Sequence, residues 1–378
     1  MGIPSLIQLA KQKPRPFILL LIFITGLAAR ALTFGGEAFF ENDYFRYLWD
    51  GAVLANFHSP FGYAPLEVLK PEIVNSTKIS RLIVLAQDAN DTLENINYPY
   101  LSTVYPFVGQ AFFAISYLVE PFSLNAWRAV LFCADIVNFL LIVTLLKMVG
   151  RTRLWAAVYW LNPLVIGEFF NSAHVDLLIF PFLLLAFIAA VKRWPHSSVL
   201  LLALATAVKV WPVLLLPLFL RPYVFSSLRK TIMLTLTFGL TCLVLFLPLI
   251  LELFANDVGV GLAAYSQAWQ MNDTFYKFAL ALAKGLISNF TTVDLATDFA
   301  IIEYNAHRLA RLMIALVVGA AAVLLALKPW QTTDQLVGRA LLLITLMFAL
   351  SPTQFPWYYC WLVPLLAIRP VPALLILT

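Results

Sequence analysis

Residues 127–148, WRAVLFCADIVNFLLIVTLLKM, decide the fold class of this chain. The stretch is apolar over more than the roughly 18 residues that mark a membrane-spanning helix. Comparable runs recur along the sequence, of which 62% is apolar and only 12% is charged. This composition excludes a soluble globular domain and predicts a polytopic membrane protein.

The apolar runs predict about ten transmembrane helices in one domain that covers residues 1–378. The expected spans are residues 16–34, 99–119, 127–148, 154–171, 174–191, 198–220, 231–254, 308–328, 336–351 and 357–378. A membrane β-barrel would need alternating segments of about ten residues, and the sequence has none. Because only helices and closed barrels satisfy the backbone in lipid, we predict an all-α fold.

Polar residues gather in two long loops. The first, residues 35–100, holds nine acids against four Lys/Arg, whereas the N-terminal arm carries Lys11, Lys13 and Arg15 and no acid. The positive-inside rule therefore places the arm in the cytoplasm and this loop on the outer face. We expect the second loop, residues 255–307, and the short segment 351–359 on the same face, so that three outer segments meet above the helices.

Basic residues in the middle of the chain conflict with a simple count of spans. Counting places Lys147, Arg151 and Arg153, and then residues 192–193, on the outer face, whereas positive-inside favours the cytoplasm. Either a segment between residues 99 and 126 fails to cross, or the middle helices are divided differently. The sequence leaves both alternatives open.

The densest charged cluster is ENDYFRYLWDG, residues 41–51. Glu41 and Asp43 are two residues apart, a spacing that converges carboxylates in a loop but points them apart on a regular helix. One interpretation is a solvated polar loop of the usual kind. The other is a carboxylate that serves as a general base or a cation ligand at the membrane surface.

The order of motifs resembles the GT-C superfamily of polytopic glycosyltransferases. Residues 41–65, ENDYFRYLWDGAVLANFHSPFGYAP, are similar to the first outer loop of polyprenyl-phosphate-mannose-dependent mannosyltransferases, of the GPI mannosyltransferase I type and bacterial relatives. The matching positions are Glu41, Asp43, Tyr44, Asp50, residues 59–61 and residues 63–65. Similar blocks follow at residues 103–113, 161–176, 205–217 and 351–364. The sequence departs from the family pattern at Glu41, Phe107 and Ala173, where the family has aspartate, a second proline and often glycine.

This resemblance implies an inverting transfer of mannose from a polyprenyl-phosphate donor to an acceptor hydroxyl at the outer face. Direct transfer needs one base and a stabilised leaving phosphate. We assign the base to Asp43, with Glu41 as its partner or a sugar ligand and Asp50 holding the loop. Arg46 either binds the donor phosphate or pairs with Glu41 or Asp43. The resemblance adds Tyr44, His58, Tyr105 and Gln110 to the substrate-binding candidates.

Ionisable residues inside predicted spans form a second group of candidates. Asp135, Glu168 and Lys209 fall within spans, and His174 and Asp176 lie near a helix end. Such groups usually face a cavity, a partner or water. They form either a substrate site or mutual pairs, for example Lys209 with Glu168 or Asp135, and we favour a structural pair for Asp135. His174 with Asp176 is a weak metal signal, so we predict no metal ligands, leaving a divalent cation at the acidic loop as an alternative.

Aromatic residues close the series near the C-terminus. Trp357 and Tyr358 belong to WYYCW, which is either an interfacial aromatic belt or a platform for sugar stacking, with Gln354 available to bind hydroxyls. Trp269 and Gln270 of the second loop are weaker candidates for the same role.

The predicted partners are a polyprenyl-phosphate sugar donor, membrane lipids, and a lipid, glycan or protein acceptor that the sequence does not select. No nucleotide-binding glycine motif is present, so a lipid-linked donor is favoured over a nucleotide sugar. The basic residues are scattered at helix ends, so we predict no nucleic-acid partner. The predicted location is a bacterial inner membrane or an endoplasmic-reticulum-type membrane. The competing hypothesis is a transporter or flippase for a polyprenyl-linked sugar, in which Asp135, Glu168 and Lys209 would line the path.

Overall fold

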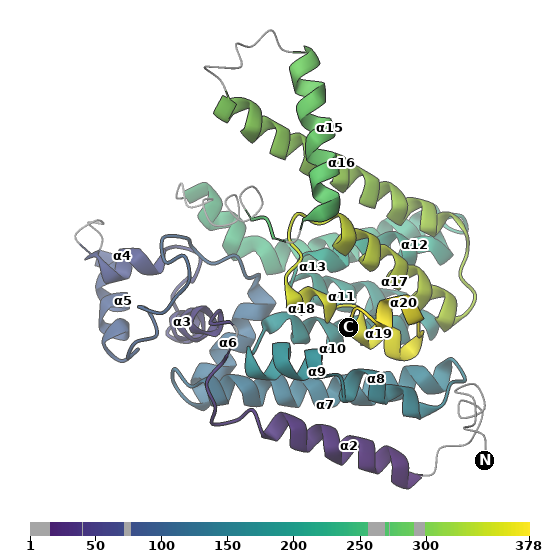
Figure 1. Ribbon diagram of the computed structural model, residues 1–378, viewed down its shortest axis with the longest axis horizontal. Helices are drawn as coiled ribbons and strands as arrows, with labels where there is room; N and C mark the ends of the chain where they lie inside the picture. Colours follow the sequence, from purple (N-terminus) through teal and green to yellow (C-terminus); the bar gives the residue numbers. More distant parts are fainter. Residues whose placement is uncertain (1–15, 40, 72–76, 256–268, 272, 291–298) are drawn as a thin grey trace.

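The computed structural model describes residues 16–39, 41–71, 77–255, 269–271, 273–290 and 299–378. Over these residues the chain is helical, and its only β pairing is an isolated bridge between Met271 and Thr353 (Figure 1). This confirms the predicted all-α fold.

Four helices are long and apolar enough to cross a membrane: α7 (Leu124–Met148), α13 (Leu228–Ala255), α16 (Phe299–Leu327) and α17 (Thr333–Leu350). A fifth span is formed if residues 163–171 and 175–191 act together, although these segments meet at an angle of 106°. These are counts over the described ranges, and the full set of ten spans stays a prediction.

Several other expected spans are broken, and the helices found in these parts of the chain are short. They are α2 (Pro16–Ala31), η2 (Arg153–Ala156), α8 (Ala157–Trp160), α9 (Pro163–Ile166), η3 (Gly167–Asn171), η4 (Val175–Leu178), α10 (Ile179–Val191), α11 (Pro195–Thr206), η5 (Trp211–Leu215), α12 (Leu216–Val224), α18 (Pro356–Tyr359), α19 (Val363–Ile368) and α20 (Pro372–Leu375). Many begin at a proline, which lacks an N–H and fits the first turn of a new helix better than the interior of an old one. The expectation of continuous helices over 154–171, 198–220 and 357–378 was therefore wrong.

The first polar loop is itself helical, with α3 (Tyr44–Ala55), α4 (Pro65–Leu69) and α5 (Thr77–Gln87). Helix α3 packs closely on α6 (Phe107–Val119), where a Cβ on Gly51 would overlap the backbone carbonyl of Phe113. Phe113 in turn lies with its ring centroid 5.1 Å from that of Trp127 near the start of α7. Helix α6 is 13 residues long, too short for the roughly 20 residues of a span. The structure thus favours the alternative in which a segment between residues 99 and 126 does not cross.

The start of α2 lies at the end of the molecule away from α3 (Figure 1), and several of the basic residues that conflicted with simple counting have contacts near it. Arg153 and Pro16 line one small apolar groove there. Arg151 and Arg369 both pair with Asp334, at 3.4 and 2.8 Å. Helix α7 leads from the segment after α6 to these basic residues, an arrangement that agrees with positive-inside if the basic end is cytoplasmic.

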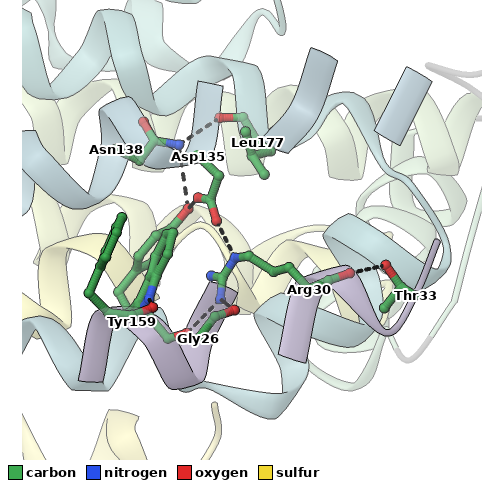
Figure 2. A network of polar contacts seen from close by, with 9 residues as sticks. Gly26, Arg30, Thr33, Asp135, Asn138, Tyr159 and Leu177 are labelled. Atoms are coloured by element: carbon green, nitrogen blue, oxygen red, sulfur yellow. Dashed lines mark hydrogen bonds and ion pairs between the residues drawn. The ribbon is translucent and has the colours of Figure 1, made fainter. Parts of the chain in front are cut away.

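A buried ion pair fastens α2 to α7 (Figure 2). The Arg30 Nε atom lies 2.6 Å from Asp135 Oδ2, and both side chains are fully buried. Arg30 also donates to the carbonyls of Gly26 and Trp160, and the Tyr159 hydroxyl donates to Asp135. The expected structural role of Asp135 agrees with this network, but the suggested partner, Lys209, was wrong.

Candidate active site

A cavity of about 670 Å³ opens where the three polar segments meet. Its walls come from residues 41–47 and 97–106, the break between α11 and η5, residues 269–271, and residues 355–361. Met271 donates to the Pro352 carbonyl at 3.0 Å, and the Trp269 and Tyr98 rings lie 4.7 Å apart. The described residues of the three polar segments therefore meet at one cavity, and their position on the outer face stays a prediction.

Glu41 and Asp43 line this cavity from the chain just before α3. Asp43 is the N-cap residue of α3, yet its side chain makes no capping hydrogen bond. A carboxylate at this position is favoured by the helix dipole. Asp43 already has helical φ and ψ, but Glu41 lies in irregular backbone before the helix, so the two acids are not held apart by one regular helix and both reach the cavity.

The environment raises the pKa of both acids. For Asp43 the main cause is burial, which a hydrogen bond from Asn97 and the positive charge of Lys209 partly oppose. For Glu41 burial again raises the pKa, followed by the charge of Asp43. Asn97 also donates to Asn42, so the acidic turn is fixed against the segment that carries residues 97–103.

Arg46 lines the cavity but uses its guanidinium on the backbone. Its Nη1 donates to the Leu101 carbonyl at 3.0 Å, and Nη2 donates to the carbonyls of Tyr98 and Asn97 at 3.1 and 3.5 Å. The pKa of this buried side chain is lowered, chiefly by burial. Arg46 therefore shapes the wall rather than pairing with Glu41 or Asp43.

Asp50 and Gln110 lie beneath this wall. The Gln110 amide donates to Asp50 at 3.0 Å, to the Thr103 hydroxyl at 3.0 Å and to the Tyr105 carbonyl at 3.3 Å. Burial raises the pKa of Asp50, and the charge of Arg46 opposes this. Both side chains are buried, so they hold the segment 103–105, while Tyr105 itself lines the cavity.

Lys209 lies in the break between α11 and η5 and pairs with Asp176 of η4. Its ammonium lies 2.8 and 2.9 Å from the two oxygens of Asp176, and the Trp361 indole donates to the same carboxylate at 2.7 Å. Lys209 and Asp176 both line the cavity. Both residues were predicted as candidates from the sequence. The suggested pairing of Lys209 with Glu168 or Asp135 was wrong, because Lys209 pairs with Asp176.

Glu168 and His174 lie at the sharp bend behind the cavity. His174 Nε2 is 3.6 Å from Glu168 Oε2, and the His174 ring stacks on Trp357 at 4.0 Å. Ala173 adopts a φ of +59°, the left-handed region in which glycine is at ease. The tight turn before the histidine is thus kept although residue 173 is alanine.

Aromatic rings form a continuous wall. Tyr358 stacks on Trp361 at 4.1 Å, and Trp361 stacks on Trp211 at 5.4 Å. Trp357 and Trp269 line other parts of the cavity. This arrangement goes beyond an interfacial belt, because buried rings face a concave site.

Besides Asp50, Gln110, Glu168 and His174, three more sequence candidates are not among the residues that line the cavity. Tyr44 packs on Phe45 at 4.3 Å, His58 lies on the turn after α3, and Gln354 donates to the Ala349 carbonyl at 3.0 Å. Sequence reasoning missed Asn97 and Trp211, which line the cavity. A lone asparagine and a lone tryptophan carry no spacing signal that would have identified them.

No group of three or more His, Cys, Asp or Glu side chains in the described part of the chain could hold a metal ion together. The oxygens of Asp176 accept from Lys209 and Trp361, and His174 faces Glu168.

Comparison with known proteins bears on the half of the chain that carries these acids. Residues 38–223 match the family model described as alpha-(1->6)-mannopyranosyltransferase, N-terminal domain. The matched range includes Asp43, Asp176 and Lys209. No curated protein and no solved structure shows a significant match to the chain. Residues 38–223 are therefore similar to the N-terminal domain of that mannosyltransferase family.

Proposed function

We propose that this chain is an inverting mannosyltransferase that uses a polyprenyl-phosphate donor at the non-cytoplasmic face of the membrane. The single observation that carries the proposal is the cavity that holds Asp43 and Glu41 together with Lys209. The family match supports the sugar. The basic end of the molecule supports the face, since positive-inside puts that end in the cytoplasm and the cavity on the other side.

The reaction follows from the chemistry of these groups. Asp43 accepts the proton of the acceptor hydroxyl, whose oxygen then forms a bond to the anomeric carbon of mannose. The bond between that carbon and the phosphate oxygen breaks, and polyprenyl phosphate leaves with the electron pair. One displacement inverts the anomeric configuration, so a single base suffices. Stacked aromatic rings offer faces for the sugar.

The test is sugar transfer by the purified full-length chain in detergent. Radiolabelled polyprenyl-phosphate-mannose is offered to a total lipid extract, with wild type compared with Asp43→Asn and with Asp88→Asn. Asp88 is an exposed acid of the same loop and serves as the matched control. We expect transfer by wild type and Asp88→Asn, and a loss of about 100-fold or more in Asp43→Asn.

Two outcomes would overturn the proposal. Transfer by Asp43→Asn within about threefold of wild type would remove Asp43 as the base, since base catalysis contributes more than that. Donor that binds wild type and is recovered unchanged would favour the transporter hypothesis, because detergent solution has no closed compartment. Polyprenyl-phosphate-glucose, offered in parallel, tests whether mannose is the sugar.

A further inference from the structure

Lys209 is presented to the cavity by a buried carboxylate. The Lys209 side chain is 22% exposed, whereas Asp176 behind it is 1% exposed. The ammonium also lies 4.8 Å from the Tyr358 ring centroid and 5.4 Å from that of Trp361. The carboxylate and the rings fix the position of the cation, and its open side faces the cavity.

A second donor lies two residues further along the same break. Trp211 lines the cavity, is 8% exposed and stacks on Trp361. Its indole Nε1 is a buried donor with no hydrogen-bond partner in the structure. Buried donors are normally satisfied by protein, water or ligand, so this N–H indicates a missing acceptor. The neighbouring indole of Trp361 differs, because it donates to Asp176.

Lys209 is better placed than Arg46 to bind an anion. These are the two Lys or Arg side chains among the described residues that line the cavity. Arg46 commits its guanidinium to three backbone carbonyls. An ammonium is a compact charge that holds a phosphate well, and it shares this cavity with Asp43 while coming from a distant part of the chain.

We infer that Lys209, together with the Trp211 indole N–H, binds the phosphate of the lipid-linked donor, and that Asp176 positions Lys209. This inference rests on the proposed function, because it names the leaving-group site of that reaction. As the bond to the anomeric carbon breaks, the phosphate gains negative charge. Lys209 stabilises this charge and keeps its own proton.

The experiment measures equilibrium binding of labelled polyprenyl monophosphate and of uncharged polyprenol to the purified full-length chain in detergent. The variants are Lys209→Met and Trp211→Phe, with Lys277→Met as the control, since Lys277 is 71% exposed and lies outside the cavity. We expect Lys209→Met to weaken polyprenyl-phosphate binding by about tenfold or more, as for a lost charge-assisted hydrogen bond. Trp211→Phe should weaken it by about fivefold. Polyprenol binding and the control should not change.

A third variant covers the case in which Lys209→Met fails to fold around an unpaired Asp176. The double variant Asp176→Asn with Lys209→Met removes both charges and should fold while losing phosphate affinity. Unchanged polyprenyl-phosphate affinity in this variant, eluting as a monodisperse species, would overturn the inference. So would wild-type binding that is abolished by EDTA, since a cation at the acidic loop would then hold the phosphate.

The two proposals fail in different ways. Lys209-dependent binding of polyprenyl phosphate without any mannose transfer would contradict the proposed function and support the phosphate site. Mannose transfer with unchanged donor KM and unchanged polyprenyl-phosphate affinity in Lys209→Met would overturn the phosphate site and leave the transferase intact.

Discussion

Two buried ion pairs, Arg30 with Asp135 and Lys209 with Asp176, have similar contacts and different surroundings. The first pair lies 2.6 Å apart with both side chains at 0% exposure, and the second lies 2.8 Å apart with 22% exposure on the lysine. A pair that is closed on both sides can only hold helices together. A pair that is open on the cationic side can also bind a ligand.

The contacts around each pair support this difference. Arg30 stacks over Trp160 at 3.8 Å and donates to backbone carbonyls, so its surroundings fix α2 on the bundle. Lys209 makes its hydrogen bonds to Asp176 and lies beside rings that line the cavity. Substitutions should therefore separate stability from activity at the two pairs.

The largest expected effect on stability is at the closed pair. Asp135→Ala leaves Arg30 charged and unpaired, which should cost about 3–5 kcal/mol of unfolding free energy. Asp176→Ala should cost less, because Lys209 retains partial access to solvent in the cavity. The measurement is the midpoint of denaturation in SDS–detergent mixtures.

A double substitution provides the control for this comparison. Arg30→Met with Asp135→Leu removes both charges and should restore most of the lost stability, since apolar replacements of buried pairs are often neutral. Equal losses for Asp135→Ala and Asp176→Ala would contradict the distinction between a closed and an open pair.

The dependence of kcat/KM on pH at the acidic end tests whether the open pair, Lys209 with Asp176, acts on Asp43. Asp43 must be ionised to act as a base, so kcat/KM falls as pH decreases through its pKa. Because burial raises the pKa of Asp43, this acid limb of the pH profile should lie above the value of about 4 of an ordinary aspartate. The charge of Lys209 lowers the pKa of Asp43, so Lys209→Met should move the limb of its residual activity to higher pH. A limb that stays in place would show that the two groups do not share a site, and Lys277→Met serves as the control.

The smallest expected effect concerns the turn that leads to Asp176. Ala173 has a φ of +59° and is fully buried, and its carbonyl accepts from the Trp127 indole at 2.7 Å. Ala173→Gly should change the unfolding free energy by less than about 1 kcal/mol, because relief at positive φ offsets the lost methyl. Ala173→Val should destabilise by about 2 kcal/mol or more, since β-branched side chains disfavour this region. Similar effects of both substitutions in the same denaturation assay would show that the backbone there is not strained.

Fold class could be predicted from the sequence because long apolar runs leave no soluble alternative. The breaks could not, since hydropathy averages over prolines such as Pro163 and Pro212 that begin new helices. The short α6 was hidden because residues 99–106 add apolar length without adding helix. The packing of α6 against α3 and α7 favours a position of α6 at one end of the helix bundle.

Glu41 and Asp43 could be predicted as site residues because they lie in a charged cluster, and because the motifs that follow come in the order of a known family. The pairing of ionisable residues within the spans could not be predicted, because it depends on how helices far apart in the sequence pack together. Arg30 falls inside the first predicted span, so the rule that flagged Asp135 could also have flagged it. Trp211 is one of ten tryptophans, and only the cavity distinguishes it.

The most direct test of the account is a comparison of steady-state kinetics for Asp43→Asn and Lys209→Met with varied polyprenyl-phosphate-mannose. With Asp43 as the base and Lys209 as the phosphate ligand in one cavity, Asp43→Asn should lower kcat by about 100-fold or more with little change in donor KM. Lys209→Met should raise donor KM by about tenfold or more. Donor KM that rises in Asp43→Asn and stays constant in Lys209→Met would contradict this division of roles.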